Sequence, residues 1–224
     1  MSTVPSIATA PAGSAGSHTP AGSAGSHTPA STRLVAAWEV AGFLVILLVG
    51  SFLHFLYELS GFALPAAIFG SVNESTWEHL KLFYWPGVAF AVIQHAYLRR
   101  RVSNFWLAKG MSLALITVLE IIAFYCYVGI VVPIDGKGTL AGSIITAMIA
   151  IGIAQYVSFR FLTGSPRAAW TRTLGIGLLV ALGVMMIVFT FAPPHVFLFD
   201  NFFGYRYSGD FGILKDYTPY LVFK

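Results

Sequence analysis

The chain has 224 residues, of which 57% are hydrophobic and only 10% are charged, with a mean hydropathy of +0.76 and a formal net charge of +4. A soluble globular domain carries about 25% charged residues, so this composition excludes a water-exposed globular surface and favours a polytopic membrane protein. The positive charge does not indicate a nucleic-acid partner, because the arginines flank apolar segments instead of forming a basic patch. We therefore predict an all-α fold, a polytopic transmembrane helical bundle embedded in the lipid bilayer.

The chain divides into three parts by composition. Residues 1–33 are rich in Ala, Gly, Ser, Thr and Pro and contain a tandem repeat that starts at Pro11 and again at Pro20. Such a sequence cannot bury enough apolar area to offset chain entropy, so we expect a disordered low-complexity tail. Residues 34–192 form the predicted transmembrane domain, and residues 193–224, which are aromatic and glycine-rich, are expected to lie against the membrane surface.

About five apolar segments in the middle part approach the roughly 20 residues that cross a bilayer. They cover residues 35–59, 82–98, 105–132, 140–161 and 174–192, and the second is expected to continue a helix that starts near Asn73. Residues 61–70 are apolar but too short to cross and contain Pro65, which is typical of a re-entrant or interfacial segment.

Basic residues predict the orientation of the bundle in the membrane. Loops on the side of the N-terminus hold most of them, and this bias places the N-terminus inside and the C-terminus outside. We expect an integral protein of a bacterial-type plasma membrane. The residues counted on the inner side are Arg33, Arg99, Arg100, Arg101, Lys109, Arg160, Arg167 and Arg172.

Polar side chains are concentrated at the start of the second apolar segment. Asn73 or Ser75 can cap the helix that begins there, and Glu78, three residues after Ser75, would complete a capping box. The structural interpretation is a well-capped helix with a Glu78–Lys81 pair.

Capping needs one acid, but this segment holds two acids and His79. Ionisable groups are costly next to lipid, and by default they mark function. We therefore predict catalytic roles for Glu74, Glu78 and Lys81.

Histidines in three separate segments are candidate metal ligands. His54 and Glu58 have i,i+4 spacing, which on a continuous helix presents an imidazole and a carboxylate to one ion or forms a simple intrahelical hydrogen bond. His195 follows two prolines at the exit of the last apolar segment. The predicted topology brings these residues to the same membrane face as His79. We predict that His54, Glu58, His79 and His195 bind a divalent metal such as zinc.

Glu120 lies well inside the third apolar segment. An acid at the bilayer centre costs about 2.5–3.5 kcal/mol on insertion scales, so it requires a partner or a function. We count it among the catalytic candidates and expect it to contact Gln155 or a tyrosine, or else His54 or Lys81 of the site.

The run from Ser71 to Pro86, SVNESTWEHLKLFYWP, resembles the signature of a family of small polytopic membrane proteins of unknown function. The HFLYE sequence at His54–Glu58 and PPHVFLFD at Pro193–Asp200 are similar to further segments of that family. The resemblance implies a membrane fold and no established activity. A looser similarity in the style of the site is to membrane-embedded metal hydrolases of the alkaline ceramidase and adiponectin-receptor group, whose late paired-histidine motif is absent here.

Three functions are compatible with these patterns. The first is metal-dependent hydrolysis or acid/base chemistry on a lipid-like or small amphipathic ligand. The second is a proton- or cation-coupled carrier in which Glu120 and His54 form the path. The third is a non-catalytic scaffold whose polar groups lock the helices together.

Overall fold

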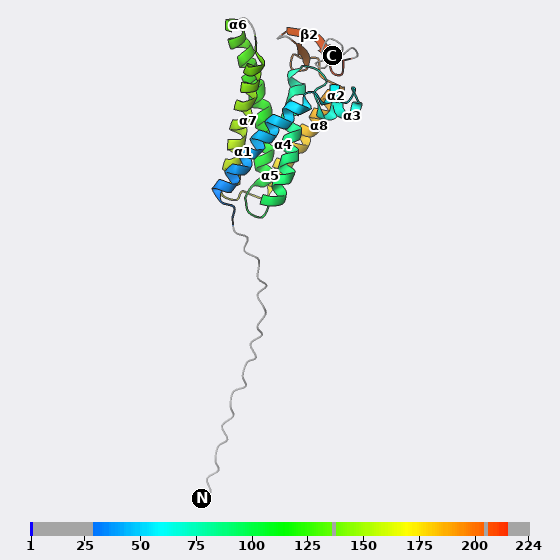
Figure 1. Ribbon diagram of the computed structural model, residues 1–224. Helices are drawn as coiled ribbons and strands as arrows, with labels where there is room; N and C mark the ends of the chain where they lie inside the picture. Colours follow the sequence, from blue (N-terminus) through cyan, green and yellow to red (C-terminus); the bar gives the residue numbers. More distant parts are fainter. Residues whose placement is uncertain (2–28, 136–137, 204–205, 215–224) are drawn as a thin grey trace.

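The structure, a computed structural model, describes Met1 and residues 29–135, 138–203 and 206–214, and it forms a helical bundle (Figure 1). Four helices are long and apolar enough to cross a membrane, which confirms the predicted all-α membrane class. They are α1 (Thr32–Leu53), α5 (Phe105–Cys126) with its continuation through η1 (Tyr127–Val131) and α6 (Val132–Asp135), α7 (Leu140–Leu162) and α8 (Trp170–Phe191). The tandem repeat and the last ten residues of the chain lie outside the described residues.

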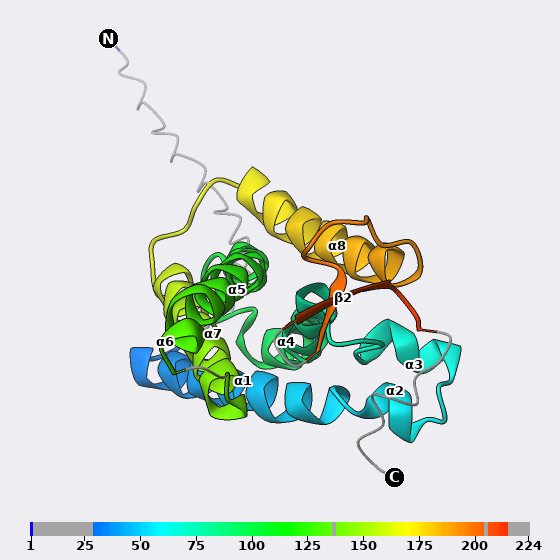
Figure 2. The same cartoon turned by 90° about the horizontal axis from the view of Figure 1, so that it is seen from above.

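Helix α4 (Thr76–Leu98) is as long as the others but less apolar, and it is not one of the four candidate spans. It occupies the middle of the bundle, with α1 on one side and α8 on the other (Figure 2). Ser75 is its N-cap, and the Ser75 hydroxyl accepts the backbone N–H of Glu78 at 3.3 Å. The helix therefore begins at the second of the two predicted caps, because Asn73 is engaged elsewhere.

The first predicted span is wrong at its end. Helix α1 stops at Leu53, a turn follows, and the short helices α2 (Leu56–Leu59) and α3 (Leu64–Phe69) complete the segment. Gly70 packs directly against this break, since a Cβ atom there would lie 2.9 Å from the carbonyl oxygen of Leu53. Gly70 thus lets the chain pass close to the end of α1, at a turn that the apolar composition of residues 35–59 did not predict.

A β-hairpin of β1 (Asp200–Phe203) and β2 (Arg206–Phe211) follows α8 and was not predicted. Helix α8 ends at Phe191, as expected before Pro193 and Pro194. The hairpin lies over the ends of α4 and α8, at the same end of the bundle as α2 and α3 (Figures 1 and 2). We call this the hairpin end, and the end at which α1 begins the opposite end.

Candidate metal centre

Three side chains converge at the hairpin end. Nε2 of His54 lies 3.2 Å from Nε2 of His79, and Oε2 of Glu74 lies 3.5 Å from the first nitrogen and 3.4 Å from the second. One ligand atom from each residue therefore lies at a corner of a nearly equilateral triangle. In the part of the chain that the structure describes, this is the one group of three or more His, Cys, Asp or Glu side chains close enough to share an ion.

The size of this triangle matches tetrahedral zinc. Zinc–ligand bonds of about 2.0–2.1 Å at tetrahedral angles separate two ligand atoms by about 3.3 Å. Two histidines and a carboxylate also form the facial triad of non-haem iron, but octahedral angles would bring the ligand atoms to about 3.0 Å. Three protein ligands leave the fourth tetrahedral position open, which is the arrangement of catalytic zinc sites.

Each ligand comes from a different local structure. His54 is the C-cap of α1, where the helix breaks, and His79 lies one turn inside α4. Glu74 lies between them in sequence, on the loop that leads from Gly70 into the capped start of α4. His54 keeps helical backbone angles at the end of α1, where its N–H donates to the carbonyl oxygen of Gly50 at 3.1 Å, so α1 places this imidazole at the level of His79.

The hydrogen bonds around His79 suit a metal ligand. Its Nδ1 lies 2.8 Å from the carbonyl oxygen of Ser75 and donates to it, so Nε2 is the nitrogen that would give up its proton and present a lone pair to an ion. Metal-bound histidines usually donate their second ring nitrogen in this way, which fixes the tautomer and the ring orientation. Nδ1 of His54 is buried and has no hydrogen-bond partner among the described residues.

Electrostatics at the triangle favour a carboxylate beside imidazoles. Burial raises the pKa of the Glu74 carboxyl, but the hydrogen bonds with His54 and His79 outweigh burial and hold that pKa below its usual value. Burial likewise lowers the pKa of His79, and the hydrogen bond and charge of Glu74 reverse the shift and raise it. Glu74 is thus ionised and directs negative charge at the point that a cation would occupy.

Two of the predicted metal ligands lie outside this group. Glu58 is on α2, beyond the turn at His54 and Phe55, and it is not one of the side chains whose ligand atoms could share an ion. His195 is exposed and stacks on the ring of Phe211, with ring centroids 4.4 Å apart and an interplanar angle of 10°. The third side chain of the group, beside His54 and His79, is therefore Glu74, for which the sequence predicted a catalytic role.

Glu78 and Lys81 form a closed buried pair. The Lys81 ammonium, 0% exposed, contacts the Glu78 carboxylate, the carbonyl oxygen of Ala67 at 2.8 Å and the Thr190 hydroxyl at 2.9 Å. The Glu78 carboxylate also accepts the backbone N–H of Val72 at 3.0 Å. All three ammonium protons thus have an acceptor, and the pair ties α3, α4 and α8 together. This geometry favours a structural role for both residues.

Glu120 is buried on α5, and its Oε1 accepts a hydrogen bond from the Thr146 hydroxyl of α7 at 3.0 Å. The predicted contact with Gln155 is absent, because that amide bonds to the Glu39 backbone and to Ser112. Oε2 of Glu120 has no partner among the described residues. Glu120 does not belong to the triangle, although its charge contributes to the raised pKa of His79.

A second buried ion pair, near the opposite end, was missed by the sequence analysis. Lys109 was counted as a loop charge but lies inside α5, where its ammonium contacts Oε1 of Glu39 at 2.7 Å and the Ser158 hydroxyl at 3.0 Å. Gln94 donates to the same Glu39 oxygen at 2.7 Å. Glu39 near the start of the first apolar segment was the available signal, since an acid there requires a partner in lipid.

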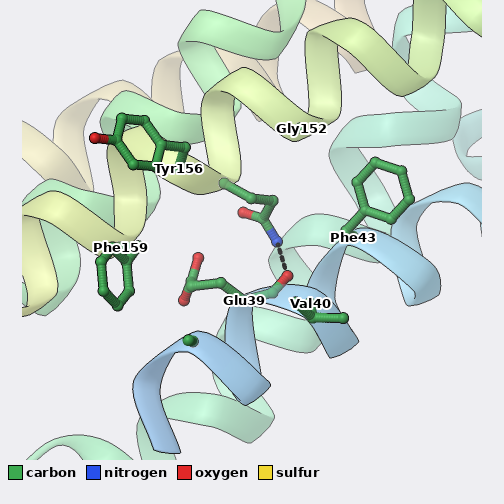
Figure 3. A pocket seen from close by; sticks show the side chains of 8 residues that line it. Glu39, Val40, Phe43, Gly152, Tyr156 and Phe159 are labelled. Atoms are coloured by element: carbon green, nitrogen blue, oxygen red, sulfur yellow. Dashed lines mark hydrogen bonds between the residues drawn. The ribbon is translucent and has the colours of Figure 1, made fainter. Parts of the chain in front are cut away.

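A shallow groove of about 390 Å³ runs between α1 and α7 beside this pair (Figure 3). Phe43 and Val40 line it from α1 and Tyr156 and Phe159 from α7, and Gln155 donates to the backbone oxygen of Glu39 at 3.2 Å. The lining is almost entirely apolar, as expected of a surface that faces lipid, and the groove lies away from the histidine–glutamate triangle.

Comparison with known proteins identifies a family. The sequence profile of a family of unknown function, DUF6512, matches residues 30–213. The chain belongs to this family. The match covers every residue of the triangle and both buried ion pairs, and it agrees with the expected resemblance to an uncharacterised family. No curated protein and no solved structure matches the chain.

Proposed function

We propose that this protein is a membrane-embedded, zinc-dependent hydrolase that cleaves a lipid-like substrate at the hairpin end of the bundle. The observation that carries the proposal is the triangle of His54, Glu74 and His79, with edges of 3.2 Å, 3.4 Å and 3.5 Å. Zinc held by three protein ligands would lower the pKa of a bound water and polarise a substrate carbonyl.

The surroundings support an amphipathic substrate. The three ligand side chains are 24–33% exposed, so the site is open to a reactant. Phe52, Leu59 and Phe69, on the neighbouring α1, α2 and α3, are 57%, 55% and 43% exposed. Exposed apolar side chains of this size suit contact with acyl chains, whereas the ligands themselves suit a polar group at the membrane surface.

Glu120 is the proton acceptor we assign to the reaction. It is the one buried glutamate of the described residues without a lysine partner, since Glu39 pairs with Lys109 and Glu78 with Lys81. Its Oε2 has no hydrogen-bond partner there, and its charge reaches His79. A carboxylate with one oxygen that has no partner among the described residues can receive the proton of the attacking water.

Among the described residues, an apolar layer interrupts the polar path that the carrier alternative needs. Glu120 and Thr146 lie towards the hairpin end, whereas Ser112 and Gln155 lie towards the opposite end. Between these two pairs, Ile116 of α5 and Ile151 of α7 are 1% and 0% exposed within one apolar core cluster. A proton path from Glu120 to the other side of the bundle would have to cross this layer.

The test is an assay of ester and amide lipids in liposomes that contain the purified protein, with zinc added after chelation. We expect turnover by the wild type, and a loss of about 10²–10⁴-fold in kcat for Glu120→Gln with its zinc content unchanged, as for removal of a general base. Thr146→Val is the matched control, because it removes the hydroxyl but keeps the carboxyl. Full zinc loading with no turnover on any ester or amide would contradict the hydrolase proposal.

A further inference from the structure

The loop that carries Glu74 is held by the C-terminal part of the chain. The backbone N–H of Glu74 donates to Oδ1 of Asn201 at 2.9 Å, and Asn201 is 0% exposed. Asn201 is on β1, so a residue far along the chain fixes the backbone of a metal-ligating residue directly. No motif in the sequence predicted this contact, because it depends on the β1–β2 hairpin, which was itself not predicted.

Residues on both sides of Glu74 are tied to the same segment. Nδ2 of Asn73 donates to the carbonyl oxygen of Gly212 at 2.8 Å. The backbone N–H of Trp77 donates to the carbonyl oxygen of Leu198 at 3.0 Å. The Trp77 ring also packs on Phe199, with centroids 4.9 Å apart. We call residues 198–203 and 206–212 the C-terminal clamp.

The clamp acts on the one ligand that no helix positions. His54 and His79 are placed by α1 and α4, whereas Glu74 stands on a loop whose place is set by Asn201 and by the bonds of Asn73. A ligand on an unsupported loop would lose rotational and backbone freedom on binding an ion, and that entropy cost would weaken affinity. Contacts that order the loop beforehand remove part of this cost.

We propose that Asn201 is a positioning residue of the metal centre and that metal binding and docking of the C-terminal clamp are coupled. The inference rests on the proposed function, since it requires an ion at the triangle. Coupling between two equilibria is reciprocal, so an ordered clamp increases zinc affinity and bound zinc holds the clamp more firmly. Displacement of the clamp by a partner or a lipid surface would therefore lower the zinc affinity of the triangle or release the ion.

The first experiment compares two matched variants in detergent by competition titration with a zinc chelator. Asn201→Ala removes the acceptor of the Glu74 N–H. Ser208→Ala leaves that acceptor in place and removes the hydroxyl that accepts from Nδ2 of Asn201 at 3.2 Å and from the Asp210 N–H at 3.2 Å. We expect zinc affinity to fall about 10–100-fold in Asn201→Ala, as for loss of an outer-shell partner, and to change less than about 3-fold in Ser208→Ala. A lower Tm of Asn201→Ala with unchanged affinity would show a merely structural residue and overturn the proposal.

The second experiment uses the wild type alone and does not depend on a variant that folds. Amide hydrogen exchange is measured along the chain with and without saturating zinc. We expect zinc to slow exchange in the clamp as well as at Glu74, and to leave the α5–α7 core unchanged. Zinc binding without any effect on the clamp overturns the coupling and leaves the proposed function standing, whereas no zinc binding by the wild type overturns both.

Discussion

Glu74→Gln should lower the zinc affinity of the purified protein by more than the 10–100-fold typical of an outer-shell change, because it replaces a charged ligand with a weakly coordinating amide. The variant keeps the size of the side chain and the backbone contact to Asn201, so the loop stays in place. The measurement is a competition titration with a chromophoric chelator in detergent.

Glu58→Gln is the matched control for this titration. Glu58 is a nearby, partly buried glutamate on α2 that lies outside the triangle, and we expect its variant to bind zinc within about 3-fold of the wild type. The comparison shows which carboxylate binds the ion: Glu58, as the helical spacing in the sequence predicted, or Glu74, as the geometry of the fold indicates. A loss of affinity in Glu58→Gln with none in Glu74→Gln would place the ligand set on the other carboxylate.

Lys81→Met should destabilise the protein by about 3–5 kcal/mol, because it leaves the Glu78 carboxylate buried without its cation. The double variant Glu78→Gln with Lys81→Met should recover most of that loss, since it removes both charges and retains an amide oxygen for the Val72 N–H. Unfolding by denaturant in micelles measures all three proteins. A double variant no more stable than Lys81→Met would contradict a paired structural role.

The same double variant separates the structural role from the catalytic role that the sequence suggested. If Glu78 and Lys81 serve only to join α3, α4 and α8, the folded double variant retains zinc affinity and turnover. A stable double variant with normal zinc content and no activity would show that Glu78 and Lys81 have a catalytic role.

The helices were predictable because long apolar runs have few alternatives in a membrane. The C-terminal limit of α8 was predictable because two prolines stop it. The break after Leu53 was not predictable, since the sequence there contains neither Gly nor Pro and the close approach of Gly70 to the turn is a tertiary contact. One predicted pair of ligands, His54 and Glu58, depended on a continuous helix, and the structure instead places Glu58 on α2 and outside the triangle.

The polar residues were likewise predictable only in part. The segment that contains Glu74 and His79 was recognisable because ionisable groups are rare beside lipid. The Glu78–Lys81 pair of the structural interpretation is present, whereas the contacts of Glu74 with His54 and His79 were not predictable from spacing. Lys109 was misread for a related reason: a base near the end of an apolar run looks topogenic until the fold brings Glu39 beside it.

The most direct measurement is elemental analysis of the purified wild type, combined with X-ray absorption at the metal edge. We expect one zinc ion per chain, with imidazole and carboxylate ligands at about 2.0–2.1 Å, and we expect the triple variant His54→Ala, Glu74→Gln, His79→Ala to lose it. A wild type that binds no metal under zinc-replete conditions, or a triple variant that retains it, would contradict the metal centre; bound iron in place of zinc would keep the site and contradict hydrolysis.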